Sequence, residues 1–424
     1  MDKKLYNDYV EILNTELIPA LGCTEPIALA YAAAQMRKTL GHIPESMNAH
    51  CSGNIIKNVK GVKVPNSGGL KGVEAAVILG MVGGNAEKAL EVLADISDAD
   101  REETIRLLKE KICSVSLEDG VPNLFIEVSG RYGDDEAMVR IEDTHTNITH
   151  IEKNGEVLFE KEKVAAADGP DKSGLKLDAI IDFANEVDLS EVAFVLNRQM
   201  EYNFAISEEG LKNDWGARVG KTSLASGNKS LRCRAICRAA AGSDARMGGC
   251  ALPVVINSGS GNQGMTCSLP VMEYAHDKGI SKEKLMRALC ISNLFALDQK
   301  KYIGSLSAYC GAVCAAAGAG AAITYLAGGT KKQIENTVVT TIATVGGMVC
   351  DGAKASCAGK IYTALHAAYM AHEMAMCDTG YESGDGLVMD SPEDTVKALG
   401  CMGRCGMRGT DLEILNIMIG KTEI

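Results

Sequence analysis

Hydrophobic positions at the start of the chain recur at the three- and four-residue spacing of an amphipathic helix. The stretch from Leu5 to Leu17 keeps this spacing and ends before Pro19. A second helix is predicted from Thr24 to about Leu40, because Thr24 can cap a helix and Pro26 fits its first turn. Further helical patterns before residue 112 cover 70–80 and 86–111.

The hydrophobic period changes to two between residues 112 and 164. Apolar and polar residues alternate over 114–117, 124–128 and 138–141, which is typical of strands with one buried face. The run Lys153-Asn154-Gly155-Glu156 is a hairpin signal, because Asn-Gly favours the tight turn that joins two antiparallel strands. This part of the chain therefore predicts an antiparallel sheet.

Beyond a predicted linker at Ala165–Pro170, the pattern is almost wholly helical. We therefore expect an α+β protein, in which a large all-helical domain covers 166–424 and a smaller α/β domain with the antiparallel sheet covers 46–165. We expect the N-terminal helices in 1–45 to join the helical domain. The chain has 45 Gly, six Phe and one Trp, so its core must consist mainly of small aliphatic side chains, which suits closely packed helices.

Charge and segment composition exclude several classes of partner. The net charge of −12 is spread along the chain without a basic stripe, so a nucleic acid backbone would be repelled. The N-terminal residues lack the apolar region of a signal peptide. The segment from Cys310 to Leu326 is apolar but short and rich in Gly and Ala, which predicts a buried helix rather than a membrane span. We expect a cytoplasmic protein without a nucleic acid or membrane partner.

Fifteen cysteines are too few for a disulfide scaffold in a chain of 424 residues that lacks an export signal. Most of these thiols should therefore be reduced. A cysteine-rich chain in a reducing compartment is more often a metal-binding or catalytic protein than a disulfide-bonded one. For most of the fifteen, however, packing as a small buried hydrophobic residue is a sufficient explanation.

Cys23 lies just before the helix predicted to start at Thr24. The partial positive charge of a helix N-terminus favours a thiolate, so we expect a lowered pKa and a residue able to act as a base or nucleophile. Taken alone, this position is somewhat better explained by the packing of a small residue beside a turn.

Cysteines in the C-terminal half form spaced groups, and their spacing alone does not select a metal site. Cys310, Cys350 and Cys357 stand at Gly-rich breaks, where the backbone can approach a cluster and donate N–H groups to its sulfurs. Three thiolates would leave one iron of a cluster open for Lewis-acid chemistry, although three thiolates and a water could equally hold a catalytic zinc ion. Cys314 follows Cys310 by one helical turn and could compete with it as a ligand.

The most loop-like stretch of the helical region is 257–264, which runs into a predicted helix. Its backbone N–H groups and the helix start would suit a carboxylate. The letters from Gly259 to Gly264 match a dinucleotide-binding fingerprint, but no βαβ unit surrounds them, so we do not interpret them in that way.

In these residues the chain resembles the cysteine desulfidase family. This family is related to the iron-sulfur L-serine dehydratases and needs no pyridoxal phosphate. The resemblance covers nearly the whole chain. The motifs that carry it are Leu21-Gly22-Cys23-Thr24-Glu25-Pro26, the 65–72 segment, the 258–264 loop, and Cys310, Cys350 and Cys357.

The resemblance implies that Cys310, Cys350 and Cys357 ligate a 4Fe-4S cluster with one iron not ligated by cysteine, so that 166–424 would be the catalytic domain. It also implies that Cys23 is the base that removes the substrate Cα proton. The position of the loops suggests that the amino-acid substrate contacts Ser67, Gly68, Ser258, Gly261, Asn262 and Gln263.

The expected reaction is pyridoxal-independent β-elimination of L-cysteine to pyruvate, ammonia and hydrogen sulfide, catalysed by one thiolate base and one Lewis-acid cluster. Two alternatives stay open. The same chemistry on L-serine would release water in place of sulfide, and a non-catalytic sensor would use the cluster as a signal. The Gly- and Ala-rich helices would pack closely enough to support a homodimer.

Overall fold

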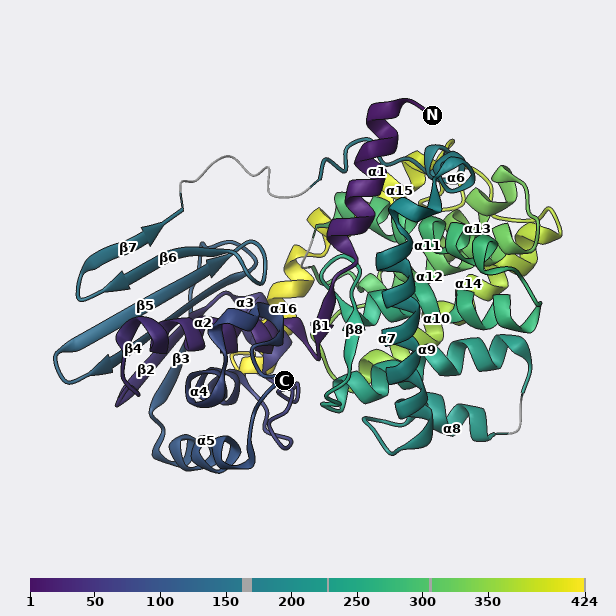
Figure 1. Cartoon of the computed structure of the whole chain (residues 1–424). Coiled ribbons are helices and arrows are strands. Elements are labelled where there is room, and N and C mark those ends of the chain that lie inside the picture. Colours follow the sequence, from purple (N-terminus) through teal and green to yellow (C-terminus); the bar gives the residue numbers. More distant parts are fainter. Residues whose placement is uncertain (162–169, 227–228, 305–306, 423–424) are drawn as a thin grey trace.

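The structure is a computed structural model, and it describes residues 1–161, 170–226, 229–304 and 307–422. Buried side chains form two large hydrophobic clusters, one around a sheet and one within a helical body. Figure 1 shows the sheet with its covering helices on one side and the helical body on the other. The expected α+β class, with a small sheet-containing region and a mostly helical body, is confirmed.

The main sheet has six strands in the order β3-β2-β4-β5-β6-β7. The pairs β2–β4, β4–β5, β5–β6 and β6–β7 are antiparallel, whereas β2 and β3 are parallel and are connected by three α-helices and a 3-10 helix. Asn154 and Gly155 have φ angles of 53° and 79° and form the predicted turn between β6 and β7. The strands are β2 (Ser46–Cys51), β3 (Cys113–Leu117), β4 (Phe125–Tyr132), β5 (Asp135–Glu142), β6 (Ile148–Lys153) and β7 (Glu156–Glu160).

Helix α2 (Thr24–Leu40) packs on the sheet, although the sequence pattern led us to expect it in the helical body. It contacts β4, β5 and α4 (Val73–Gly83), and its buried alanines belong to the same cluster as the sheet. Only α1 (Lys3–Glu16) packs in the helical body, through Tyr9, Ile12 and Leu13. The remaining helices beside the sheet are α3 (Gly53–Val59), η1 (Ala86–Glu91) and α5 (Asp98–Glu110).

The helical body surrounds α12 (Gly311–Leu326), which contacts α10, α11, α13 and α14. Almost every residue of α12 is buried, as predicted for this small-residue segment, because its Gly and Ala side chains let the neighbouring helices approach closely. No helix in the described part of the chain is long and apolar enough to cross a membrane. The other helices of the body are α6 (Leu177–Glu186), η2 (Leu189–Glu191), α7 (Ala193–Lys212), α8 (Val219–Ala225), α9 (Leu231–Met247), α10 (Gly261–Asp277), α11 (Lys282–Ile303), α13 (Lys331–Val345), α14 (Ser356–Met376) and α15 (Pro392–Cys401).

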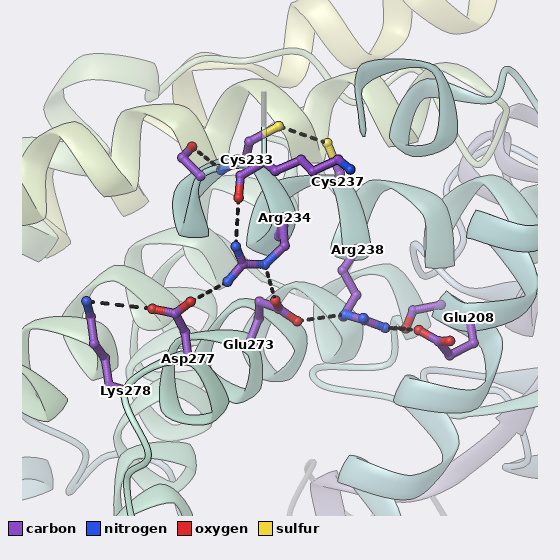
Figure 2. A network of polar contacts seen from close by, with 11 residues as sticks. Glu208, Cys233, Arg234, Cys237, Arg238, Glu273, Asp277 and Lys278 are labelled. Atoms are coloured by element: carbon purple, nitrogen blue, oxygen red, sulfur yellow. Dashed lines mark hydrogen bonds and ion pairs between the residues drawn. The ribbon is translucent and has the colours of Figure 1, made fainter. Parts of the chain in front are cut away.

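Charged side chains link α9 to α10 within this body, as Figure 2 shows. Arg234 Nε and Arg238 Nε donate to the two oxygens of Glu273, at 2.8 and 3.1 Å. On α9, the sulfurs of Cys233 and Cys237 lie 3.7 Å apart. Both cysteines are buried within the helix packing, so core packing explains this four-residue cysteine spacing.

Four elements, β1, β8, η3 and α16, connect the sheet region to the helical body. Strand β1 (Pro19–Leu21) pairs antiparallel with β8 (Pro253–Val255), just before α2 starts. After α15, η3 (Met402–Gly406) leads into α16 (Arg408–Ile419), which crosses to contact α3. Figure 1 shows these elements between the two parts. The domain boundary predicted near residue 165, like most of the predicted linker, lies outside the described residues.

The close approach of α4 to α2 gives a test of the packing around the sheet. A Cβ atom at Gly80 would collide with the Ala30 carbonyl, so Gly80→Ala should destabilise the protein by about 2 kcal/mol. Gly409, in the first turn of α16, has no neighbour within 4 Å, so Gly409→Ala should be neutral or slightly stabilising. Urea denaturation of both variants measures the difference, and equal midpoints would contradict the packing.

Candidate functional site

A cavity of about 460 Å³ lies between the sheet region and the helical body. The sheet region contributes the start of α2, part of α3 and the 143–146 loop between β5 and β6. The helical body contributes the 258–263 segment, the start of α12 and residues around 350–357. Segments far apart in the sequence therefore meet at one hollow, as expected for a small-molecule site.

Cys23 lies at this cavity as the N-cap residue of α2, with 2% of its surface exposed. Its thiol donates a hydrogen bond to Glu25 Oε2 at 3.0 Å. Burial and the Glu25 carboxylate raise the pKa of Cys23 well above its ordinary value, and Arg246 opposes them only in part. The expected lowering of this pKa is therefore wrong, because desolvation and a neighbouring anion outweigh the charge of the helix end.

Glu25 is a functional candidate that the sequence pattern did not reveal, because it looked like an ordinary acidic residue in a first helical turn. Asn58 Nδ2 donates to its Oε1 at 2.9 Å, and Thr24 Oγ1 lies 3.3 Å from its Oε2. Burial favours the protonated acid, but His145, the Cys23 hydrogen bond and Arg246 together hold the pKa of Glu25 below its ordinary value. The carboxylate is therefore ionised in the resting site.

Arg246 reaches from α9 to the turn that precedes Cys23. Its Nε donates to the Gly22 carbonyl at 2.9 Å, and only 3% of the residue is exposed. A Cβ atom at Gly261 would lie 2.5 Å from Arg246 Nε, so the glycine leaves room for the guanidinium. Gly22 has a φ of 63° and packs directly on Pro65, so a larger residue would displace the turn.

The predicted substrate contacts divide into two groups. Ser258, Asn262 and Gln263 line the cavity, whereas Gly261 sits behind it against Arg246. Ser67 and Gly68 do not line the cavity. Their loop lies behind the Gly22 turn through Pro65, and Ser67 Oγ donates to the Leu70 carbonyl at 3.3 Å.

Several polar atoms at the cavity have no hydrogen-bond partner among the described residues. They are Asn54 Oδ1, His145 Nε2, Asn262 Oδ1 and Gln263 Oε1, all shielded from solvent. A buried polar atom without a partner is costly, and a bound polar molecule would satisfy it. Ser260 caps α10 and accepts from Gln263 N at 3.4 Å, so the N-terminus of this helix also faces the cavity.

Cys310, Cys350 and Cys357 all line the same cavity as Cys23. Cys310 is the N-cap residue of α12, and Cys357 lies in the first turn of α14. Cys310 N donates to Met348 O at 2.9 Å, while Cys350 N donates to Ala308 O at 2.6 Å, so two short paired segments carry these two cysteines. Cys314 is fully buried one turn into α12 and does not line the cavity.

The three cavity thiols differ in acidity. A hydrogen bond from the Cys310 thiol lowers the pKa of Cys350 to about 6. Burial raises this pKa and so opposes the hydrogen bond, whereas the charge of Lys57 lowers it further. The pKa of Cys310 is raised by the same hydrogen bond and by burial, and burial raises that of Cys357. In the described residues, no group of three or more His, Cys, Asp or Glu side chains is arranged to hold a single metal ion.

Two buried lysines place positive charge beside these thiols, and neither was anticipated from the sequence. Lys57 is 2% exposed and forms an ion pair with Asp411 of α16. Lys300 is 6% exposed, and burial lowers its pKa although the thiols of Cys314, Cys350 and Cys310 favour its charged form. Charge of this sign would stabilise thiolates at the cavity.

The raised pKa of Cys23 predicts slow alkylation at neutral pH. The thiolate is the reactive form, so Cys23 should react with iodoacetamide at least roughly tenfold more slowly than the exposed Cys377 at pH 8, and faster as the pH rises. Peptide mass spectrometry after timed labelling gives both rates. Equal rates at pH 8 would contradict the acidity inferred for Cys23.

Comparisons with known proteins identify the family of the chain. The family described as serine dehydratase alpha chain matches residues 87–416. A UPF0597 protein of Lachnoclostridium phytofermentans is 50% identical over 98% of this chain and 100% of its own length. UPF0597 proteins of Treponema denticola and Desulfitobacterium hafniense are each 46% identical over 99% of this chain, and over 99% and 98% of their own lengths. The chain therefore belongs to the UPF0597 group of the serine dehydratase alpha chain family.

Proposed function

We propose that this protein is an iron-sulfur-dependent lyase that converts L-cysteine to pyruvate, ammonia and hydrogen sulfide without pyridoxal phosphate. The observation that carries the proposal is the meeting of Cys23, Cys310, Cys350 and Cys357 at one cavity. Membership of the serine dehydratase alpha chain family supports β-elimination from a small amino acid.

The donor set at the cavity fits a 4Fe-4S cluster. Cys310, Cys350 and Cys357 supply three sulfur ligands, and Lys57 and Lys300 offset negative charge. The described residues hold no group of three or more His, Cys, Asp or Glu side chains arranged around a single metal ion, so the zinc alternative gains no support there. When bound, a cluster with one iron not ligated by cysteine would supply a Lewis acid.

The other cavity groups suit an amino acid. The N-terminus of α10 and the N–H groups of 258–263 favour a carboxylate. The amide oxygens of Asn262 and Gln263 can accept hydrogen bonds from an ammonium group, which would satisfy atoms that otherwise have no partner among the described residues.

Cys23 is the base in the proposed reaction. Its sulfur removes the Cα proton, and the Cα electron pair forms the double bond as hydrosulfide leaves Cβ. The released aminoacrylate tautomerises and hydrolyses to pyruvate and ammonia. No electron is transferred to or from the protein.

The family name favours a second candidate, L-serine, with water as the leaving group. Anaerobic reconstitution, followed by iron and sulfide analysis and by pyruvate assays on cysteine and serine side by side, distinguishes the two substrates. We expect a higher kcat/KM for cysteine, brown protein with broad iron-sulfur absorption, and no bound aldehyde cofactor. A higher kcat/KM for serine would establish the dehydratase instead.

The proposed ligand set predicts different results for neighbouring cysteines. Replacing Cys310, Cys350 or Cys357 with alanine should abolish cluster binding, because each removes one of three sulfur ligands. Cys314→Ala should keep the full iron content, since its thiol lies outside the cavity. Iron counts on the four reconstituted variants measure this, and loss of iron from Cys314→Ala alone would overturn the assignment.

An iron open to substrate is also open to oxidants. We expect activity to disappear on exposure to air and to return after incubation with iron, sulfide and reductant. This loss and recovery are measured as the rate of pyruvate release before exposure to air, after exposure and after reconstitution. Full activity in iron-free, chelator-treated protein is incompatible with the proposed cofactor.

A further inference from the structure

The proposed reaction leaves one feature of the cavity without a role, namely the half-buried Glu25 carboxylate beside the base. Its Oε2 lies 3.0 Å from Cys23 Sγ, and Glu25 itself lines the cavity. Shielding an ionised carboxylate from solvent is costly, even when the shielding is partial. Its location next to the one thiol that must accept a proton suggests a catalytic use.

The resting site also presents a problem for Cys23 as a base. Cys23 carries its proton and donates it toward Glu25, so no lone thiolate is ready to attack the substrate. A base that is already protonated needs an acceptor for its own proton. Among the described residues, Glu25 is the ionisable side chain recorded in hydrogen-bond contact with the Cys23 sulfur.

We infer that Glu25 is a catalytic residue that accepts the proton of Cys23 while Cys23 takes the Cα proton of the substrate. This inference rests on the proposed lyase function and deepens it. The two residues then work as a proton relay, in which sulfur contacts the substrate and the carboxylate stores one proton.

Protons and electrons balance over one complete turnover of the relay. The Cα proton passes to Cys23 sulfur, the original thiol proton passes to Glu25, and the Cα electron pair expels hydrosulfide from Cβ. The Cys23 thiol then protonates the departing hydrosulfide and recovers the proton held by Glu25. The products are aminoacrylate and hydrogen sulfide, and the protein returns to a thiol beside a carboxylate.

The surroundings hold Glu25 in place for this exchange. Asn58 Nδ2 donates to Oε1, which leaves Oε2 directed at Cys23. The charged and titratable groups that face the carboxylate from other elements are His145, on the β5–β6 loop, and Arg246, on α9. Both favour the ionised carboxylate in the resting state, so the proton returns to Cys23 when the cycle ends.

Glu25→Gln tests the relay, because glutamine keeps the size of the side chain and one accepting oxygen but cannot accept a proton. We expect kcat to fall about 100- to 10,000-fold at pH 7 with little change in KM. The rate of the variant should then rise with pH, because Cys23 must first lose its proton to water, whereas the wild-type rate stays level from about pH 6 to 9.

Two variants serve as controls. Glu142→Gln changes a buried glutamate, which accepts from Thr149 Oγ1 at 2.8 Å outside the cavity, and should retain wild-type kinetics. Glu25→Asp keeps a carboxylate at a greater distance, so it should lower kcat and keep the level pH profile. This second variant also tests the relay if Glu25→Gln does not fold.

The outcomes separate the relay from the proposed function. Wild-type kcat in Glu25→Gln, or a low rate without alkaline recovery, overturns the relay while the lyase stands. An alkaline rise in Glu25→Asp overturns it as well. If cluster-loaded wild-type protein releases pyruvate from neither cysteine nor serine, the lyase and the relay both fail.

Discussion

The hydrogen bond from Arg246 to the Gly22 carbonyl joins two separately packed cores at the place where the cavity forms. It fixes the turn that presents Cys23, and it brings a buried cation near Glu25 and His145. The approach is possible because Gly261 has no side chain there. The position of Cys23 and the positive charge near Glu25 therefore depend on the same contact.

The main free-energy cost of folding at this site is the burial of ionisable groups. Arg246, Lys57 and Lys300 have little contact with water and Glu25 is half-buried, so each loses hydration on folding. Opposite charges and hydrogen bonds offset part of that loss, as with Lys57 and Asp411. A protein core seldom contains so many such groups without a chemical role, so the arrangement favours function over stability.

The sequence predicted features that depend on local pattern. Alternating residues revealed the sheet, Asn154-Gly155 revealed its last hairpin, and the apolar run before Leu326 revealed a buried helix. The placement of α2 was not predictable in this way, because an alanine-rich helix that is buried nearly all round has no polar face to orient it. The parallel pairing of β2 and β3 likewise depends on tertiary packing.

The candidate site was predictable to the same limited degree. Glycine breaks singled out Cys310, Cys350 and Cys357, and the cavity brings them together. The acidity of Cys23 was mistaken because it depends on Glu25, whose side-chain direction no sequence rule supplies. Ser67 and Gly68 were placed at the cavity by their loop character alone, whereas the loop instead lies behind the Gly22 turn.

The cavity wall also constrains the timing of assembly. Its residues run from Thr15 to Ile361, and Lys57 in that wall is paired with Asp411. The chain must therefore have left the ribosome at least as far as Asp411 before all of these surfaces can meet. A molecule that contacts the whole cavity wall binds these segments after they have folded together, not one by one as they are synthesised.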